Sequence, residues 1–258
     1  MTTPTHHSPR RVEFKYVIPV DLRDRLLGEL VPYVGADRHG GADGTYRVNT
    51  LYYDSPDLQC YFDKIQGFDR RRKLRVRRYG PPRAEAEAQP LWIEIKQRIG
   101  QTIGKRRFFI TLDRFNQMMR SGDLGEFAST GNGRRALAEE MLALVTLHQL
   151  RPVLTVRYLR LAFVGRFERG LRITFDSGVR CAEHFGEPTR CGHGRYMLPP
   201  HLCIMEAKIN DASSRWLNNL MARHNLTHQR YSKYCAAVER LNLLDWKGLS
   251  KWTHGSMN

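Results

Sequence analysis

Three segments of this chain place a glutamate two residues before a lysine in a stretch that alternates like a β-strand, at Glu13/Lys15, Glu94/Lys96 and Glu206/Lys208. Side chains two residues apart on a strand point to the same face, about 6.6 Å apart. The residue between the two charges is apolar in each segment. The pattern therefore predicts antiparallel strands with one charged face and one apolar face.

Basic side chains recur on the same face of neighbouring segments, at Lys73/Arg75/Arg77, Lys105/Arg107, Tyr158/Arg160 and Arg172. For any single strand, a charged face that meets water explains such a pattern. Adjacent like charges repel one another, however, unless an anion lies between them. If the sheet closes into a barrel, these charges lie inside, where only a counter-charged ligand compensates them.

The net charge of +16 also indicates an anionic partner. A triphosphate or polyphosphate fits, because arginine pairs with phosphate oxygens through two donors and lysine supplies a compact charge. Glu206, with Glu94, Glu13 or Asp176, is placed to hold a hard divalent ion that bridges phosphate oxygens. Phosphoryl transfer requires little beyond this positioning and charge neutralisation.

The domain organisation is predicted to be simple, with one domain over residues 11–243 and flexible tails at 1–10 and 244–258. No apolar run reaches about 18 residues, so no membrane span is expected. The start of the chain lacks the apolar region of a signal peptide. Five cysteines without a CxxC motif are typical of reduced thiols, so we expect a cytoplasmic protein.

Two other kinds of site are considered and set aside. Residues 181–203 contain potential zinc ligands at Cys181, His184, Cys191, His193, His201 and Cys203, but their spacing matches no standard finger. The basic clusters at 69–78 and 104–107 are accompanied by no nucleic-acid-binding module. We therefore expect neither a zinc site nor a nucleic-acid partner.

A string of motifs along the chain resembles the VTC domain, the catalytic domain of the vacuolar transporter chaperone complex, in its bacterial stand-alone form. The motifs, in order, are EFKYVIP, NTLYYDSPDLQCY, KLRVRRYG, WIEIKQR with GKRRF, LRPVLTVRYLRLAF, LRITFDS, IMEAKIN and RYSKYCAAVERL. The family belongs to the triphosphate tunnel metalloenzymes, related to CYTH proteins. The resemblance implies an α+β fold with an antiparallel eight-stranded β-barrel that forms a tunnel braced by helices.

The resemblance also implies a polyphosphate polymerase that moves the γ-phosphate of ATP onto a growing polyphosphate chain, releases ADP, and uses Mn²⁺ or Mg²⁺. It assigns catalytic contacts to Lys15, Arg75, Arg77, Lys96, Lys105, Arg160 and Lys233, substrate contacts to Tyr158 and Ser232, and metal binding to Glu206. Alternation along the strands adds Arg107, Arg172 and Lys208 to the residues expected to contact substrate. Glu94, Glu13 and Asp176 are the candidate second metal ligands.

One departure from the wider superfamily bears on activity. CYTH hydrolases typically open with ExExK, whereas here Arg11 stands where the first glutamate would be, before Glu13 and Lys15. One carboxylate fewer favours a polymerase over a two-metal hydrolase. A tripolyphosphatase or nucleoside triphosphatase, and a catalytically silent polyphosphate-binding module, are the alternatives. Eukaryotic members carry a phosphate-sensing domain and membrane helices that this chain lacks, so membrane coupling is expected to need a separate membrane-protein partner.

Overall fold

The computed structural model describes residues 11–38, 40–41, 43–80, 90–100, 102–125, 133–184, 194–210 and 214–244. Its strands are β1 (Arg11–Pro19), β2 (Val34–Ala36), β3 (Thr45–Asp54), β4 (Arg70–Gly80), β5 (Leu91–Ile99), β6 (Thr102–Ile110), β7 (Arg151–Gly165), β8 (Arg172–Glu183), β9 (Arg195–Tyr196) and β10 (Leu202–Asn210). Its helices are α1 (Val20–Leu30), α2 (Gln59–Ile65), α3 (Leu112–Ser121), α4 (Arg134–Leu147), α5 (Arg215–Arg223) and α6 (Lys233–Arg240). The predicted tails lie outside the described residues, except for Leu244.

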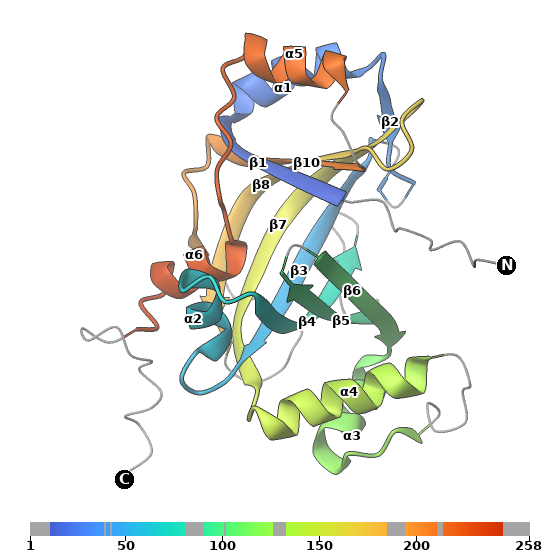
Figure 1. Cartoon of the computed structure of the whole chain (residues 1–258), viewed down its shortest axis with the longest axis vertical. Helices are drawn as coiled ribbons and strands as arrows, with labels where there is room; N and C mark the ends of the chain where they lie inside the picture. Colours follow the sequence, from blue (N-terminus) through green and yellow to red (C-terminus); the bar gives the residue numbers. More distant parts are fainter. Residues whose placement is uncertain are drawn as a thin grey trace, which may run out of the picture. The chain divides into compact units, whose positions relative to one another are not determined.

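The described strands form one antiparallel sheet (Figure 1). The main order is β1-β10-β8-β7-β3-β4-β5-β6, while the short strands β2 and β9 pair with β7 and β8. The α+β class and the eight antiparallel strands of the main order are as predicted. The predicted closed barrel is not observed, because the order ends at β1 and β6, and the described residues show no hydrogen-bonded pairing between these two strands. Alternation reveals which face a side chain takes, but not whether the first and last strands pair.

The chain divides into two compact units. Unit 1 comprises Met1–Tyr46, Leu159–Gly178 and Leu198–Tyr231, and unit 2 comprises Arg47–Tyr158, Val179–Met197 and Ser232–Asn258. The boundaries fall within β3, β7 and β8. Each unit has its own hydrophobic core. Among the described residues, no helix has the length and apolarity needed to cross a membrane.

The core of unit 1 lies between one face of its strands and the helices α1 and α5. Phe175 and Met205 contribute from β8 and β10, and Leu26 and Leu217 from the two helices. Figure 1 shows α1 and α5 side by side, and the guanidinium of Arg223 lies 2.6 Å from the carboxylate of Glu29, which joins them. Because alternate residues of these strands are apolar, burying them turns the charged residues to the opposite face.

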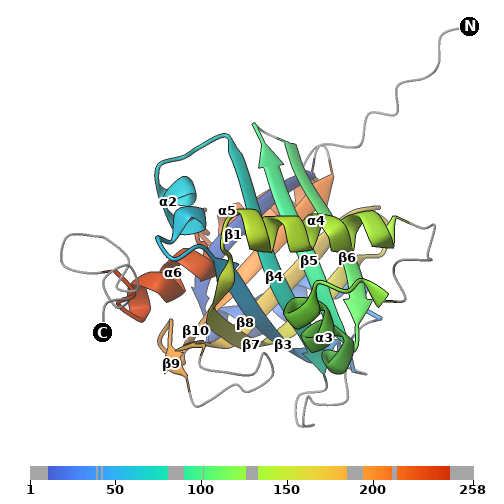
Figure 2. The same cartoon turned by 90° about the horizontal axis from the view of Figure 1, so that it is seen from below.

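The core of unit 2 lies under α3 and α4, which cross the sheet over β4, β5 and β6 (Figure 2). Ile93 and Phe108 contribute from β5 and β6, and Phe115 and Met141 from the two helices. Thr111 caps α3, since its side-chain oxygen accepts a hydrogen bond from the Arg114 amide. Lys73, Arg75 and Arg77 of β4 and Lys96 of β5 consequently lie on the face that these helices leave uncovered.

Candidate functional site

Three lysines face one another in a row across unit 2. Lys73 of β4 lies directly opposite Lys96 of β5, which lies opposite Lys105 of β6. Neighbouring strands are about 4.8 Å apart, so this three-lysine row places three cations within roughly 10 Å. Like charges directly opposite one another destabilise a strand pair unless an anion screens them. The row is therefore an arrangement that a phosphate chain would stabilise.

The next row contains a buried counter-ion for the basic residues. The carboxylate of Glu94 is fully buried and lies 2.7 Å from Arg75 Nε, 3.6 Å from Arg77 Nε and 3.5 Å from Lys105 Nζ. Burial alone would raise the pKa of Glu94, but these three cations lower it to about 2. Glu94 is thus an anion that holds the arginines in place, and its role as a metal ligand stays a prediction.

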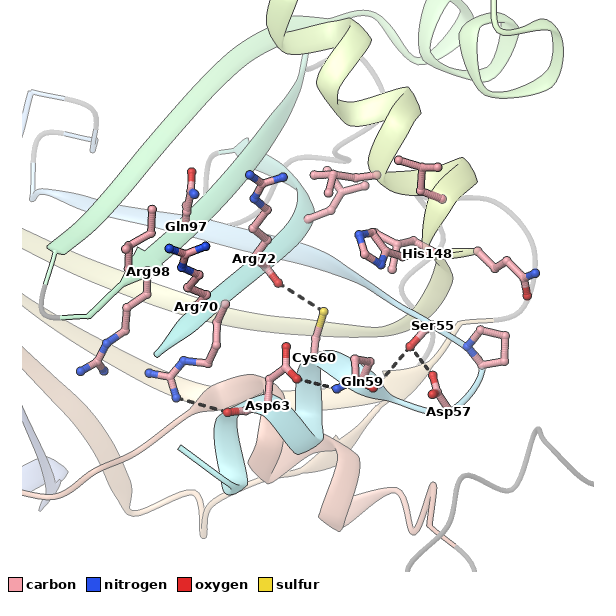
Figure 3. Close-up of a pocket in the computed structure, with 18 residues that line it drawn as sticks. Ser55, Asp57, Gln59, Cys60, Asp63, Arg70, Arg72, Gln97, Arg98 and His148 are labelled. Carbon is pink, nitrogen blue, oxygen red and sulfur yellow. Dashed lines mark hydrogen bonds between the residues drawn. The ribbon is translucent and has the colours of Figure 1, made fainter. Parts of the chain in front are cut away.

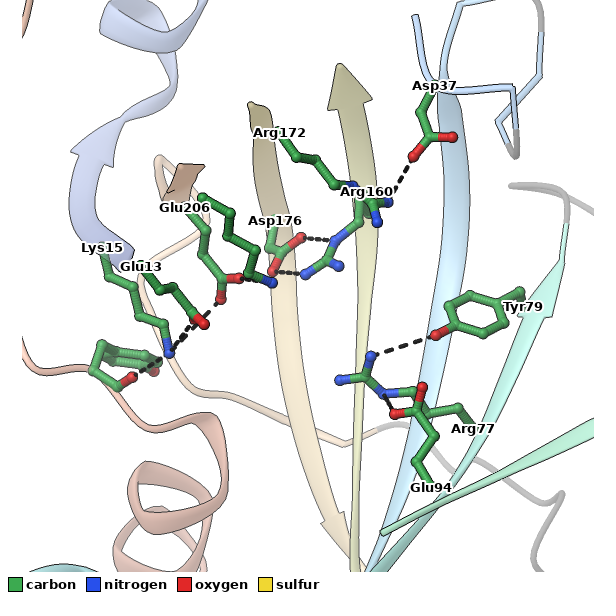
Figure 4. Close-up of polar contacts among 12 residues, drawn as sticks. Glu13, Lys15, Asp37, Arg77, Tyr79, Glu94, Arg160, Arg172, Asp176 and Glu206 are labelled. Atoms are coloured by element: carbon green, nitrogen blue, oxygen red, sulfur yellow. Dashed lines mark hydrogen bonds and ion pairs between the residues drawn. The ribbon is translucent and has the colours of Figure 1, made fainter. Parts of the chain in front are cut away.

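The third row joins Arg77 to aromatic and hydroxyl side chains (Figure 4). Arg77 Nη1 lies 3.4 Å from the hydroxyl oxygen of Tyr79, and Thr50 of β3 lies directly opposite Arg77. In the described part of the chain, the buried Thr50 hydroxyl has no hydrogen-bond partner. The guanidinium of Arg107 lies over the Trp92 ring, 4.5 Å from its centre. An anion on this face could therefore accept hydrogen bonds from arginine guanidiniums and from hydroxyl groups.

The start of α6 brings together residues that the family resemblance selects. Ser232 caps this helix by accepting a hydrogen bond from the Cys235 amide at 3.4 Å. The ammonium of Lys233 lies over the ring of Tyr158, 5.0 Å from its centre. The next residue, Tyr234, packs its ring 5.1 Å from that of Tyr52. Lys233 is thereby positioned by an aromatic surface rather than left loose at a helix end.

Asp54 begins an Asp-Ser-Pro-Asp sequence that is typical of a turn, and its side chain has a larger role. Its buried carboxylate accepts hydrogen bonds from the amides of Ser55, Cys60 and Tyr61, and from the hydroxyl of Tyr234. Burial raises the pKa of Asp54, although these donors oppose the shift. Asp54 therefore fixes the start of α2 and the first turn of α6 relative to each other.

Two charged pairs alternate between β1 and β10 in unit 1 (Figure 4). Glu13 lies opposite Lys208, and Lys15 lies opposite Glu206. Lys15 Nζ is 3.1 Å from Glu13 Oε1 and 4.0 Å from Glu206 Oε1, and Lys208 Nζ is 3.4 Å from Glu206 Oε2. Burial lowers the pKa of Lys208, while Glu206 and Glu13 oppose the shift. The two carboxylates thus share lysine counter-ions on one face.

These two carboxylates fit a divalent ion, although the described residues contain no group of three or more His, Cys, Asp or Glu placed to hold one. Mg²⁺ commonly binds through one or two carboxylates plus substrate phosphates. Thr174 of β8 lies opposite Glu206, and its buried hydroxyl has no hydrogen-bond partner among the described residues. A metal ion or its water ligands would give this unpaired buried oxygen a partner beside the Glu206 carboxylate.

The other predicted residues of unit 1 are engaged in ion pairs. Arg160 donates two hydrogen bonds to the buried carboxylate of Asp176, at 2.6 and 2.7 Å. Arg172 lies 2.7 Å from Asp37 and donates a hydrogen bond to Tyr46 at 2.9 Å. Asp176 therefore serves Arg160 in this structure, and its metal role stays a prediction.

The predicted site residues fall into two sets, one in each unit. Unit 1 contains Glu13, Lys15, Arg160, Arg172, Asp176, Glu206 and Lys208, and unit 2 contains Arg75, Arg77, Glu94, Lys96, Lys105, Arg107, Tyr158, Ser232 and Lys233. Sequence reasoning missed Thr50, Tyr52 and Thr174, because such residues are common in any strand and carry no distinguishing spacing.

The cysteines described by the structure are inert. Cys60, Cys181, Cys203 and Cys235 are free and buried. Burial raises the pKa of Cys181 to about 11 and that of Cys203 to about 12, which disfavours the thiolates that zinc requires. Cys191 and His193, two further members of the zinc candidate, lie outside the described residues.

A family model described as the VTC domain matches residues 10–242. Vacuolar transporter chaperone complex subunit 4 of Trypanosoma brucei brucei is 26% identical over 226 residues, and the subunit 4 of Trypanosoma cruzi is 22% identical over 224 residues. Each match covers 75% of this chain but 28% of the relative. A Bacillus halodurans structure titled as a candidate adenylate cyclase has a TM-score of 0.49 and 15% identity, over 90% of this chain and 98% of that one.

Proposed function

This chain belongs to the VTC domain family, and on that premise we propose that it is a metal-dependent polyphosphate polymerase that uses ATP. The observation that supports the proposal most is the three-lysine row of Lys73, Lys96 and Lys105, next to guanidiniums held by the buried Glu94. Lys105 of this row already lies 3.5 Å from Glu94, and the row as a whole offers a linear array of donors to a further anion. A linear phosphate matches it better than a compact anion does.

In the proposed reaction, the basic residues of unit 2 bind phosphate oxygens and neutralise their charge. Arg75 and Arg77 present donors in fixed orientations, because Glu94 fixes both side chains. Lys96, Lys105, Arg107 and Lys233 supply further positive charge, with Tyr158 and Ser232 positioning the last of these. Because phosphoryl transfer depends mainly on positioning and charge stabilisation, no protein nucleophile is needed.

In unit 1, Glu206 and Glu13 are the residues proposed to hold Mn²⁺ or Mg²⁺, near the unpaired hydroxyl of Thr174. Such an ion, when bound, neutralises charge on phosphate oxygens. Lys15 and Lys208 balance the two carboxylates before an ion enters, and Arg160 and Arg172 add positive charge on the same strand faces.

The transfer itself forms one bond and breaks one. A terminal oxygen of the polyphosphate chain attacks the γ-phosphorus of ATP, and the bond between that phosphorus and the β,γ-bridging oxygen breaks, which releases ADP. If water attacks instead, the protein is a tripolyphosphatase or nucleoside triphosphatase. If neither attacks, it is a polyphosphate-binding module.

Because both relatives are named as subunits of a complex, we also propose that the chain works with a protein partner. The proposed partner is a separate membrane protein that receives the polymer, with the chain itself in the cytoplasm. Nucleic acid is not proposed as a ligand.

The test is to incubate the purified chain with ATP and Mn²⁺ and to separate the products on a gel. We expect a ladder of phosphate polymers that a polyphosphatase degrades, with ADP formed in step. Orthophosphate without polymer would support the hydrolase, and ATP binding without turnover would support the silent module. Either result would overturn the polymerase proposal.

A further inference from the structure

A cavity in unit 2 lies at one end of β4 and β5, beyond the three-lysine row, and Arg71 and Arg98 from the face of that row line it together with residues of the other face. It has a volume of about 830 Å³ and lies between the ends of β4 and β5, the helix α2 and the residues that follow α4 (Figure 3). Ligand cavities typically measure about 300–1,000 Å³. The cavity is thus large enough for a small organic molecule.

The strand alternation separates this cavity from the residues proposed for catalysis. Arg70 and Arg72 lie on the same strand face as Leu74, which belongs to the core under the helices. Lys73 and Arg75 point to the opposite face. Arg72 lies opposite Gln97, and Arg70 lies opposite Ile99. These four residues line the cavity and extend the helix-covered face beyond the core.

Four arginines and two carboxylates line the cavity, namely Arg70, Arg71, Arg72, Arg98, Asp57 and Asp63. Arg70 and Arg72 are exposed, and the described residues provide neither with a salt bridge. The two lining carboxylates already accept hydrogen bonds from neighbours, with Asp57 2.5 Å from Ser55 Oγ and Asp63 2.6 Å from Gln59 Nε2. Two guanidiniums two residues apart on one strand face are suited to an oxyanion with several oxygens, above all phosphate.

The opposite side of the cavity is apolar and open. Leu147, at the end of α4, is 78% exposed. Leu144 and Leu150 line the same side, and His148 lies at its edge (Figure 3). Exposed large apolar residues grouped beside unpaired charges indicate a ligand with both characters.

We propose that this cavity binds a small phosphate ester with a planar or apolar group, of the nucleotide kind. The phosphate lies against Arg70 and Arg72, and the planar group packs on Leu144 and Leu147. Plain polyphosphate fits less well, because it leaves the apolar side exposed to water. The proposal concerns a second site and does not depend on the polymerase activity.

The experiment is isothermal titration calorimetry of the purified chain with adenosine monophosphate, orthophosphate and adenosine as separate ligands. We expect adenosine monophosphate to bind at least tenfold more tightly than either fragment. Replacing both arginines (Arg70→Ala with Arg72→Ala) should weaken this binding at least tenfold, and Leu147→Asn should weaken it severalfold. These three residues are exposed, so the variants should keep the wild-type melting temperature.

Two control variants keep the test specific. The double variant Arg106→Ala with Arg135→Ala removes the same charge from exposed positions that pair with Glu140 and Glu139, and it should bind normally. Arg75→Ala with Arg77→Ala alters the opposite face and should also bind adenosine monophosphate normally. Loss of binding in this last variant but not in the Arg70/Arg72 variant would overturn the proposal. Equal affinity for orthophosphate and the nucleotide, or a dissociation constant above about 1 mM, would overturn it as well.

Discussion

The hydroxyl of Tyr234, in the first turn of α6, donates a hydrogen bond to the buried carboxylate of Asp54 at the end of β3. Two amides at the start of α2, those of Cys60 and Tyr61, donate to the same carboxylate, as does the amide of Ser55. One side chain therefore links two helices that are far apart in the sequence. Because Lys233 precedes Tyr234, this link also sets the position of a residue proposed to bind phosphate.

Removing the link should destabilise the protein. We expect Tyr234→Phe to lower the free energy of unfolding by about 1–3 kcal/mol, because it leaves a buried carboxylate short of one donor. Urea unfolding followed by circular dichroism measures this change. Tyr61→Phe is the matched control, since its hydroxyl donates to the exposed Glu239 and its removal should cost less than about 1 kcal/mol. Equal costs for the two variants would contradict the role given to Asp54.

The arginines of β4 should dominate substrate affinity. Arg75→Ala or Arg77→Ala is expected to weaken the binding of ATP or tripolyphosphate by about 1.5–3 kcal/mol, the usual contribution of hydrogen bonds to charged groups. Titration calorimetry in a buffer without metal ions, in which no turnover is expected, measures this change in binding free energy. Arg106→Ala removes a basic residue from the opposite face of the same sheet and should leave affinity unchanged. If all three variants bind alike, the basic face of unit 2 is not the phosphate site.

Glu206→Gln should separate metal-dependent turnover from binding. The substitution keeps the size of the side chain but removes the charge that a divalent ion needs, so turnover with Mn²⁺ should fall by at least a hundredfold while ATP still binds. Glu139→Gln, which alters an exposed carboxylate on α4, should retain the wild-type rate. Full activity of the Glu206 variant would remove this residue from the metal site.

The unpaired hydroxyl of Thr174 allows a test in which stability and function change in opposite directions. Thr174→Val keeps the shape and removes a buried hydroxyl without a partner in the described residues, so stability should stay constant or rise by up to about 1 kcal/mol. If the hydroxyl contacts an ion or its water ligands, the concentration of Mn²⁺ needed for half-maximal activity should increase severalfold. A variant that loses stability and keeps its metal dependence would show that the hydroxyl has a structural partner instead.

The contribution of the Glu94 charge to the free energy of unfolding should depend on pH. Its pKa is lowered to about 2 in the folded protein, so the stabilisation is complete above its unfolded pKa of about 4.3 and is lost as the pH falls towards 2. At pH 7 the contribution is about 3 kcal/mol, on the basis of 1.36 kcal/mol for each pKa unit. The difference in unfolding free energy between wild type and Glu94→Gln should therefore be constant from pH 7 to about 5 and shrink below pH 4.3. A difference that does not change between pH 7 and 2 would contradict this ionised state.

The sequence predicted the orientation of the strand residues well, and for a physical reason. A period of two assigns each side chain of β4, β5, β8 and β10 to a face, and burial of Ile93 or Met205 then determines where Glu94 and Glu206 point. Barrel closure was predicted wrongly, because pairing between the first and last strands depends on distant contacts. The role of Asp54 was missed because its donors come from residues both near and far in the chain. The cavity beside Arg70 was missed because alternating arginines are equally expected on a strand face that is simply exposed to water.

The three-lysine row has a consequence for the motion of the sheet. β6 ends the strand order, so its hydrogen bonds to β5 alone hold it in the ladder while Lys105 is repelled by Lys96 across that junction. At low ionic strength this edge should open more often than the rest, and its amide protons should exchange with deuterium first. A multivalent anion bound to the row should reduce this opening, so the rate of amide exchange in β6 reports whether the ligand is bound.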